Sequence, residues 1–303
     1  MFGFQLTFFR QGVIPPSQII PKSDFLTRDV KFAHFALTDI SGAKFRHAQR
    51  LSRGAFGEAG FDDPPRVAWI KDWTCSATGA NSFTLRAADS DFAIDLALTP
   101  KKPPVIHGSD GISRKADGPG RASHYYSLTR LETNGTLRAG ERTFRVHGLS
   151  WFDHEWATNQ LAEHQTGWDW FSIQFDDGSE LMLFQILTGR NARDPNSGGT
   201  FIDPAGNTVP IADADFTLEP LKFWTSGSSK AKYPVTWRIR IPKLSVEVTA
   251  AAAIPNQELD TQPFTYWEGS ILAQGKRGDQ PLRGRGYLEM TGYAGRIVGL
   301  TSK

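Results

Sequence analysis

Cysteine is almost missing from this chain, and so are long hydrophobic runs. The single cysteine, Cys75, cannot form an internal disulfide, which excludes a small disulfide-held scaffold and a cysteine-based zinc site. The longest apolar run, Ala250–Ile254, is far shorter than the roughly 18 to 20 residues that a membrane helix needs. We therefore expect no transmembrane segment.

An excess of one charge is also missing, because 34 Lys and Arg nearly balance 32 Asp and Glu. No basic run is long enough to follow a phosphate backbone, so we expect no nucleic-acid partner. The chain has no Gly-x-Ser-x-Gly elbow, no Walker loop and no dinucleotide-binding Gly-x-Gly-x-x-Gly. His154-Glu155 lacks the second histidine of a helical zinc motif, and the other histidines are scattered, so we expect no metal site.

Aromatic residues are plentiful, with 9 Trp and 21 Phe, mostly in segments where apolar and polar residues alternate. Phe2, Phe4 and Leu6 open the chain in this pattern, which is typical of a half-buried strand. About sixteen such segments, separated by turn residues, predict an all-β protein of two antiparallel barrels or sandwiches in tandem. We expect hairpins over residues 31–53 and 167–187, and another hairpin turn at Asn134-Gly135.

Residues 101–120 interrupt this pattern with many prolines and glycines. A loop of that length is unusual in a compact β domain. It predicts either a binding loop or barrel lid, or a plain excursion over the surface.

The densest group of aromatic and titratable residues lies in Ser150–Trp156 (SWFDHEW) and Gly167–Phe171 (GWDWF). Alternate side chains of a strand point to opposite faces, so one face of the first segment carries Phe152, His154 and Trp156. The other face carries Trp151, Asp153 and Glu155. Trp168 and Trp170 share a face of the second segment. An imidazole between aromatic rings suits an apolar pocket with one polar group; the alternative is a Trp-rich core in which His154 bonds a neighbour.

Two Tyr-x-Glu pairs place Tyr266 with Glu268, and Tyr287 with Glu289, on one strand face each. If that face is interior, desolvation raises the pKa of the carboxyl and lets it hold a proton near neutrality. If the face is exterior, both pairs are ordinary solvated ones. Tyr125 and Tyr126, after the long loop, are candidates for lining the mouth of a pocket, with core packing as their alternative role.

The order of several segments resembles the lipocalin-like family that contains carotenoid 1,2-hydratase, also called hydroxyneurosporene synthase. The similarity is greatest to its bacterial branch of predicted secreted hydrolases. The segments that carry the resemblance are FGFQLTFFR (2–10), AHFALTD (33–39), YYSLTR (125–130), SWFDHEW (150–156), GWDWF (167–171), YWEG (266–269) and GYLEMTGY (286–293).

This resemblance implies two consecutive lipocalin-like (calycin) β-barrels, here divided as residues 1–160 and 161–303. Family members normally carry a Trp-rich strand before the segment that begins here at Phe2, and often a signal sequence. The resemblance thus implies that an upstream segment is missing and that the protein is periplasmic or secreted; a cytoplasmic location is the alternative.

In the hydratase branch, the site resembles a His-x-Trp strand beside an acid from a Tyr-x-Asp strand. His154 and Trp156 match the first part, but the strand Glu180–Gln185 lacks the second. The acid then comes from Asp153, Glu155, Glu268 or Glu289. Protonation of an alkene creates a carbocation, which the faces of Trp156, Trp168 and Trp170 would stabilise while His154 positions or deprotonates water.

Taken with the aromatic and acidic residues above, the resemblance implies a cofactor-independent enzyme that hydrates, eliminates or cyclises a hydrophobic isoprenoid, polyene or polyketide-like molecule in a barrel. We expect catalytic roles for Asp153, His154, Glu155 and Trp156. We expect Tyr126, Trp168, Trp170, Tyr266, Glu268 and Tyr287 to bind the ligand. The alternative is a lipocalin-type carrier without turnover. An acid within reach of the ligand favours the enzyme, and a wall of apolar groups alone favours the carrier.

Overall fold

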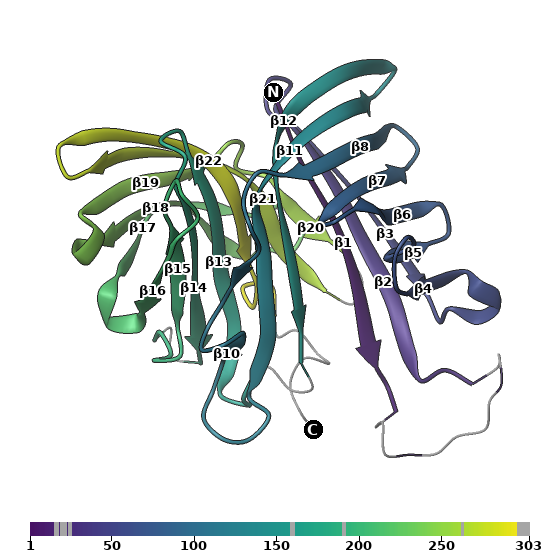
Figure 1. Ribbon diagram of the computed structural model, residues 1–303, viewed down its shortest axis with the longest axis horizontal. Coiled ribbons are helices and arrows are strands. Elements are labelled where there is room, and N and C mark those ends of the chain that lie inside the picture. The colour runs from purple at the N-terminus through teal and green to yellow at the C-terminus, as the bar shows by residue number, and fades with distance from the viewer. Residues whose placement is uncertain are drawn as a thin grey trace. The chain divides into compact units, whose positions relative to one another are not determined.

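The computed structural model is almost entirely β-structure and describes residues 1–14, 18, 23, 26–157, 161–189, 192–261 and 264–295. Its strands form a three-stranded, a nine-stranded and a ten-stranded antiparallel sheet, and the two large sheets curl as half-barrels (Figure 1). This confirms the predicted all-β class with two lipocalin-like barrels, in the form of two half-barrel sheets. Within the described ranges, no helix has the length and apolar character to cross a membrane.

The two smaller groups of strands come first in the chain. The three-stranded sheet contains β1 (Phe2–Gly12), β2 (Asp29–Asp39) and β3 (Lys44–Ser52). The nine-stranded sheet contains β4 (Ala59–Phe61), β5 (Ala68–Ile70), β6 (Trp73–Gly79), β7 (Ser82–Ala88), β8 (Phe92–Pro100), β9 (Val105–Ile106), β10 (Ile112–Arg114), β11 (Ala122–Ala139) and β12 (Arg142–Trp156). One 3-10 turn, η1 (Ala55–Gly57), precedes β4.

The ten-stranded sheet takes the rest of the chain. It contains β13 (Gln165–Phe175), β14 (Glu180–Thr188), β15 (Gly198–Ile202), β16 (Thr208–Ala212), β17 (Thr217–Thr225), β18 (Lys232–Ile241), β19 (Val246–Ala252), β20 (Glu258–Asp260), β21 (Thr265–Arg277) and β22 (Gln280–Met290). The 3-10 turns η2 (Asp213–Asp215) and η3 (Pro242–Leu244) connect strands within it. In the strand order, β13 lies between β14 and β22, and β22 lies next to β21.

The chain divides into two compact units. Residues 1–101 and 130–150 form the first unit, and residues 102–129 and 151–303 form the second. The long strands β11 and β12 each pass from one unit to the other, so the second unit contains the start of β11 and the end of β12. The expected domains, residues 1–160 and 161–303, follow chain order instead, and that division stays a prediction.

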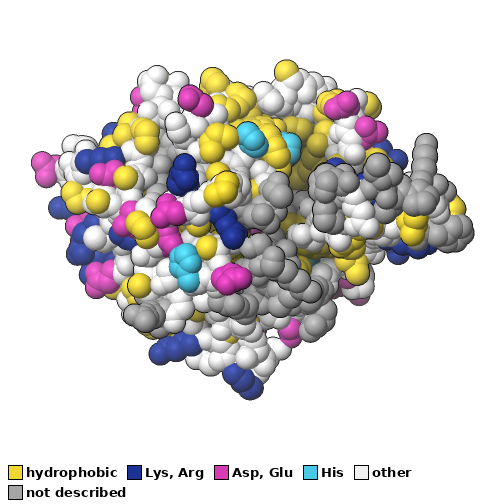
Figure 2. All heavy atoms as spheres, turned by 90° about the horizontal axis from the view of Figure 1, so that it is seen from below, with side chains coloured by type: hydrophobic (Ala, Val, Ile, Leu, Met, Phe, Trp, Pro, Cys, Tyr) yellow, Lys and Arg dark blue, Asp and Glu magenta, His cyan; other side chains and the backbone are white. Residues whose placement is uncertain are grey.

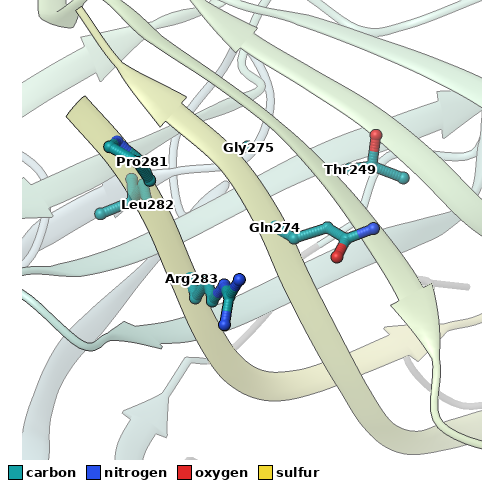
Figure 3. Close-up of a pocket in the computed structure, with 6 residues that line it drawn as sticks. All are labelled: Thr249, Gln274, Gly275, Pro281, Leu282 and Arg283. Carbon is teal, nitrogen blue, oxygen red and sulfur yellow. The ribbon is translucent and has the colours of Figure 1, made fainter. Parts of the chain in front are cut away.

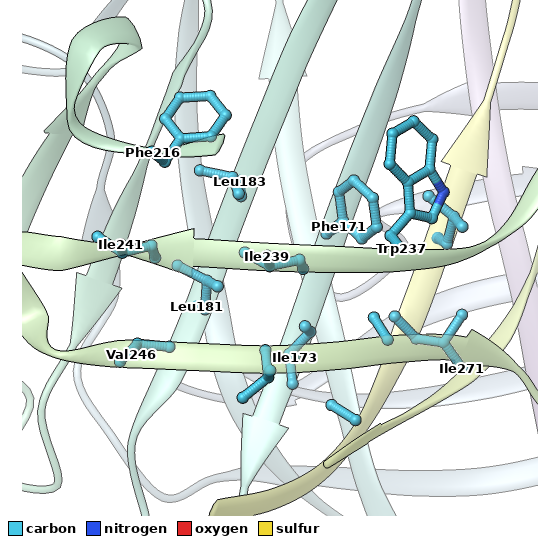
Figure 4. Packing of buried hydrophobic residues seen from close by; sticks show 14 of the residues in the cluster. Phe171, Ile173, Leu181, Leu183, Phe216, Trp237, Ile239, Ile241, Val246 and Ile271 are labelled. Carbon is cyan, nitrogen blue, oxygen red and sulfur yellow. The ribbon is translucent and has the colours of Figure 1, made fainter. Parts of the chain in front are cut away.

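Each unit has its own aromatic or aliphatic core. In the first unit, Phe35 of β2 stacks on Phe92 at 4.5 Å between ring centroids and meets the Trp73 ring edge-on at 5.6 Å. In the second unit, one face of β13 and β14 packs against β18 and β19 (Figure 4). Phe171 and Ile173 of β13 are fully buried there, because every second residue of a strand faces the same side.

The predicted hairpins over residues 31–53 and 167–187 are confirmed as β2–β3 and β13–β14. The predicted turn at Asn134-Gly135 is wrong. β11 continues through both residues and pairs with β8 in unbroken register from Leu131 to Ala139. A Cβ on Gly135 would lie 2.1 Å from the Asp95 carbonyl oxygen, so glycine is needed here for close strand approach rather than for a turn.

The segment 101–120 is more ordered than a surface excursion. Two short strands, β9 and β10, pair with β11. Val105, His107 and Lys115 are buried although the segment is rich in Pro and Gly. Residues 102–120 of this segment belong to the second unit, and they carry polar side chains into its interior.

Candidate functional site

The strands β13, β14, β21 and β22 have two chemically different faces. One face is the hydrophobic core of the second unit. On the other face, Trp170 of β13 lies opposite Glu289 of β22, and Glu289 lies opposite Glu268 of β21. Directly paired residues of antiparallel strands point to the same side of the sheet. We call this side, which also bears Phe184 and Tyr287, the acid-bearing face.

The ends of β11 and β12 that belong to the second unit add to this face. The Trp151 ring of β12 meets the Trp170 ring edge-on, 6.3 Å between centroids. The Trp170 indole N–H donates to the hydroxyl of Tyr125 in β11, 3.1 Å away. The strand alternation therefore places Trp151, Asp153 and Glu155 on the side that contacts the ten-stranded sheet.

Four carboxyl groups interact electrostatically here, and we call them the acid cluster: Asp153, Glu155, Glu268 and Glu289. The charges of Glu289 and Asp153 both act on Glu268, and the charges of Glu155 and Asp153 act on Glu289. Like charges brought together in a desolvated place resist joint ionisation. The raised pKa values of Asp153, Glu268 and Glu289 therefore let these three carboxyls hold protons at a pH where isolated carboxyls have lost them.

Burial is the main cause of the raised pKa values in the cluster. It raises the pKa of Asp153 to about 6 and that of Glu289 to about 7. The pKa of Glu268, which is only 8% exposed, is raised well above its ordinary value by burial and by the charge of Glu289. Of the two interpretations that the sequence left open, the structure thus places Tyr266 and Glu268 in the interior and Tyr287 and Glu289 in partly exposed positions with raised pKa values.

Hydrogen-bond donors hold the carboxyls in place. Asp153 accepts from the Trp151 indole N–H at 2.8 Å and from the hydroxyls of Ser127 and Tyr125. The Trp168 side chain hydrogen-bonds Glu289, and the Tyr266 side chain hydrogen-bonds Glu268. These bonds favour the ionised forms and oppose the effect of burial. Trp168 and Tyr266 are therefore linked to the acids by direct polar contacts, and Trp170 is linked to Asp153 through the Tyr125 hydroxyl.

Glu155 differs from the other three acids because a cation pairs with it. The Lys115 ammonium lies 2.9 Å from Glu155 Oε1, and the Ser123 hydroxyl donates to the same oxygen. Lys115 also lies over the Phe184 ring, 4.4 Å from its centroid. Glu155 is thus held as an ion pair at the edge of the acid cluster.

Water can reach part of this face. Asp153 keeps exposed surface although protein surrounds it closely enough to raise its pKa. Trp168, Trp170 and Glu289 are partly exposed, whereas Tyr125 and Glu268 are buried. Solvent therefore reaches Asp153 and Glu289 of the acid cluster, while Glu268 is covered.

The structure separates the sequence-predicted residues into two groups. Seven of them lie on the acid-bearing face or the strand ends that contact it: Asp153, Glu155, Trp168, Trp170, Tyr266, Glu268 and Tyr287. Tyr126, His154 and Trp156 lie on the opposite faces of β11 and β12. His154 Nδ1 is 3.2 Å from the Tyr126 hydroxyl, its ring lies 4.8 Å from the Trp156 ring, and Trp156 is 49% exposed.

His154 therefore does not lie beside the acid cluster, so the structure does not bring it together with the acid that it was expected to work with. Its neighbours Asp153 and Glu155 point away from it, because successive residues of a strand alternate in direction. The expected catalytic roles of His154 and Trp156 stay predictions.

Other residues reach the site without having been expected there. His107, Lys115 and Ser127 come from the long loop and the start of β11. Of the two tyrosines that follow the loop, Tyr125 reaches the acids and Tyr126 does not, because odd-numbered residues of this strand face the acids. The polar residues within the loop 101–120 were the available signal in the sequence that this loop contributes to the site. The sequence pattern of the loop did not show where in the fold these residues would lie.

The structure also has two hollows outside this site. The first lies over β19, β21 and β22 (Figure 3) and is lined by Thr249, Gln274, Gly275, Pro281, Leu282 and Arg283. The second lies at β11 and β12 of the first unit and is lined by Asn134, Gly135, Thr136, Arg145, Val146 and His147. Neither lining includes a carboxyl group, so neither offers the chemistry of the acid cluster.

Surface charge is mixed in the view of Figure 2, where the described Lys and Arg side chains alternate with Asp and Glu. This face shows no continuous basic patch among the described residues. The absence of a nucleic-acid partner stays a prediction.

Comparison with known proteins gives relatives along most of the chain. A crystal structure of a candidate AttH protein from Nitrosomonas europaea is 32% identical, covers 96% of this chain and 87% of its own, and superposes with a TM-score of 0.84. The crystal structure of kievitone hydratase from Nectria haematococca is 14% identical, covers 88% of this chain and 81% of its own, and has a TM-score of 0.71. At that identity it shows a shared fold.

A curated protein from Emericella nidulans, dehydratase asqC, is 21% identical over 271 residues, which are 85% of this chain and 70% of that protein. The family model described as AttH-like matches residues 1–293. The resemblance to lipocalin-like hydratases is thereby confirmed at the level of the family. This chain belongs to the AttH-like family.

Proposed function

We propose that this protein is a hydratase or dehydratase that adds water to, or removes water from, a carbon–carbon double bond of a hydrophobic small molecule. One observation carries the proposal: a base that is largely ionised at neutral pH, Asp153, lies in one cluster with two acids that retain protons, Glu268 and Glu289. General acid–base catalysis needs both protonation states within reach of one substrate.

In the direction of hydration, the Glu289 carboxyl gives its proton to one alkene carbon, and the other carbon becomes a carbocation. The faces of Trp168 and Trp170, which lie on the same side of β13, stabilise that positive charge. Water then attacks the cation and loses a proton to Asp153, which gives the alcohol. A proton moves from Asp153 back to Glu289 to complete the cycle. Dehydration follows the same steps in reverse.

The surroundings of the acids fit an apolar substrate. Met182, Phe184 and Ile186 of β14 pack with Tyr125 and Leu161, and the rings of Trp151, Trp168 and Trp170 pack against them. Carboxylates at this face disfavour an anionic ligand. Isoprenoids, polyenes and polyketide-like molecules combine an apolar body with double bonds, and they are the classes we propose.

The known relatives support this reaction class, because one relative is named a dehydratase and a protein of the same fold is named a hydratase. The cluster contains its own proton donor and acceptor, and we propose that no cofactor takes part. We also propose a periplasmic or secreted location, on the family resemblance alone, with the cytoplasm as the alternative. Cell fractionation of a producing strain tests it.

The first experiment is mass spectrometry of the protein incubated with acyclic carotenoids, shorter isoprenoids, polyenes and their alcohols. A product heavier or lighter by one water supports the proposal. An isomer of equal mass indicates a cyclase instead, and retention of unchanged ligand indicates a carrier. Either result would overturn the hydratase proposal.

Variants locate the reaction on the proposed face. We expect Glu289→Gln and Asp153→Asn each to lower turnover by about 100-fold or more while ligand is still retained. Glu247→Gln, on an exposed part of β19, is the matched control and should leave turnover unchanged. His154→Ala should also retain most activity, because His154 lies on the opposite face of β12. Loss of turnover in His154→Ala alone would place the reaction on that other face.

A further inference from the structure

A buried histidine is connected to Asp153 through one hydroxyl group. His107 is 1% exposed and Ser127 is 0% exposed. His107 Nε2 lies 2.8 Å from Ser127 Oγ, and His107 Nδ1 lies 2.9 Å from Thr200 Oγ1 of β15. The Ser127 hydroxyl in turn bonds Asp153. Four segments of the chain, the loop with His107 and the strands β11, β12 and β15, thus form one chain of hydrogen bonds that ends on the Asp153 carboxylate.

The direction of this chain follows from the chemistry of its end. An ionised carboxylate only accepts, so Ser127 donates its hydroxyl hydrogen to Asp153. The Ser127 oxygen can then accept the Nε2–H of His107, and the unprotonated Nδ1 can accept the Thr200 hydroxyl. This assignment of the imidazole tautomer rests on the hydrogen-bond network. Burial lowers the pKa of His107 to about 3, so the ring is neutral near neutral pH.

We propose that His107 is a positioning residue that acts through Ser127 to orient the Asp153 carboxylate and keep it ionised. Each bond in the chain points toward the carboxylate, so each strengthens the next. The role of Asp153 as the base rests on the proposed function. The effect of His107 on Asp153 does not, because it is a property of the resting protein.

Several other groups act on the same carboxylate and stay in place when His107 is replaced. They are Trp151, Glu155, Tyr125, Glu268 and Glu289. Lys115 is the cation that acts on His107, and its own ion pair is with Glu155. A change confined to His107 therefore tests one connection among several.

The test is a titration of the aspartate carboxyl carbons by NMR in protein labelled with ¹³C at those carbons. Asp153→Asn identifies the Asp153 signal. In His107→Leu, which removes the donor to Ser127, we expect the titration midpoint of Asp153 to rise by about half a pH unit or more. In His107→Gln, whose amide can both donate and accept, the midpoint should return toward the wild-type value. His147→Leu, at an exposed position, is the control.

An unchanged Asp153 midpoint in a folded His107→Leu protein overturns the proposal. If that variant does not fold, Thr200→Val tests the same chain from its other end, because it removes the donor to His107 and leaves the Ser127 hydroxyl in place: a rise supports the proposal, and an unchanged midpoint overturns it. Where turnover is found, the acidic limb of its pH profile should move with the midpoint. A shifted midpoint in a protein that turns over no substrate supports the role of His107 and counts against the proposed function alone.

Discussion

Asp153 combines two opposing influences on one carboxyl group. Burial among aromatic side chains favours the neutral acid, whereas donors from Trp151, Ser127 and Tyr125 favour the carboxylate. Burial prevails, because the pKa lies at about 6 rather than near 4. The result is a base that is stronger than an ordinary aspartate and fixed in direction.

The two kinds of acid in the cluster predict a bell-shaped dependence of turnover on pH. Asp153 acts when ionised, so turnover should fall as pH decreases below about 6. Glu289 acts when protonated, so turnover should fall as pH increases above about 7. Steady-state rates between pH 4.5 and 9 measure both limbs. A rate that stays constant across this range contradicts the assignment of both residues.

Asp169 is a buried acid on the other face of β13, away from the cluster. It is 0% exposed, and it accepts from the Gln185 amide at 2.6 Å and from the Tyr293 hydroxyl at 3.0 Å. Burial nevertheless raises its pKa to about 7 from the ordinary 3.8. The folded state therefore binds this proton more tightly than the unfolded state.

This raised pKa predicts how stability depends on pH. The contribution of Asp169 to the free energy of unfolding is most favourable below about pH 4. It is lost as pH rises to about 7, because the folded protein must then bury a charge. Urea unfolding at pH 5 and pH 8 measures the loss, which we expect to be up to a few kcal/mol. Asp169→Asn should reduce it. An equal loss in the variant and the wild type would contradict the interpretation.

The strands β13, β22 and β21 owe their two faces to close and regular pairing. A Cβ on Gly286 of β22 would lie 1.9 Å from the Ser172 carbonyl oxygen of β13. The pairing at this point positions Tyr287 and Glu289, the next members of the strand on the acid-bearing face. Glycine is therefore the residue that lets the acid-bearing strand lie against the Trp-bearing one.

Gly286→Ala should separate these strands. We expect a loss of about 1–3 kcal/mol in the free energy of unfolding, typical of inserting a group into a packed site, and lower turnover. The matched control is Gly148→Ala in β12, where an added Cβ meets nothing within 4 Å. Denaturant unfolding of both variants is the measurement. Equal stability of the two would show that the pairing adjusts to the methyl group.

The long segment 102–129 is held in the second unit by a buried ion pair. The Lys102 ammonium contacts Glu180 of β14 at 2.7 Å and the carbonyl oxygens of Gly178 and Asp203. Glu180 is 0% exposed. This anchor, together with His107 and Lys115, brings a loop from early in the chain to the acid-bearing sheet of the C-terminal part.

Lys102→Ala should destabilise the protein strongly, because it removes the cation that pairs with the fully buried Glu180 carboxylate. We expect a cost of about 3–5 kcal/mol. Lys101→Ala, which removes an exposed ion pair with Glu132, should cost less than about 1 kcal/mol. Thermal or urea unfolding compares the two. If both variants lose equally little, the segment is held by other contacts.

Much of the fold follows from local pattern. The period of two in the strands predicted the all-β class, the β2–β3 and β13–β14 hairpins and the common face of each Tyr-x-Glu pair. These features depend on near neighbours in the chain, where alternation alone decides which side chains share a face. A raised pKa of Glu268 and Glu289 was expected only if their strand face is interior. The sequence did not decide whether that face is interior or exterior.

The choice of face, and with it the site, was decided by long-range packing. The pattern of SWFDHEW is equally compatible with His154 or with Asp153 pointing at the tryptophans, and only the contact of β12 with β13 selects Asp153. Likewise, the local sequence Asn134-Gly135 favours a turn. Both residues nevertheless lie within the strand β11, because β11 pairs with β8 there. His107, Ser127 and Thr200 meet across separations of 20 and 93 residues. Such meetings depend on strand pairing across the sheets, which no short segment encodes.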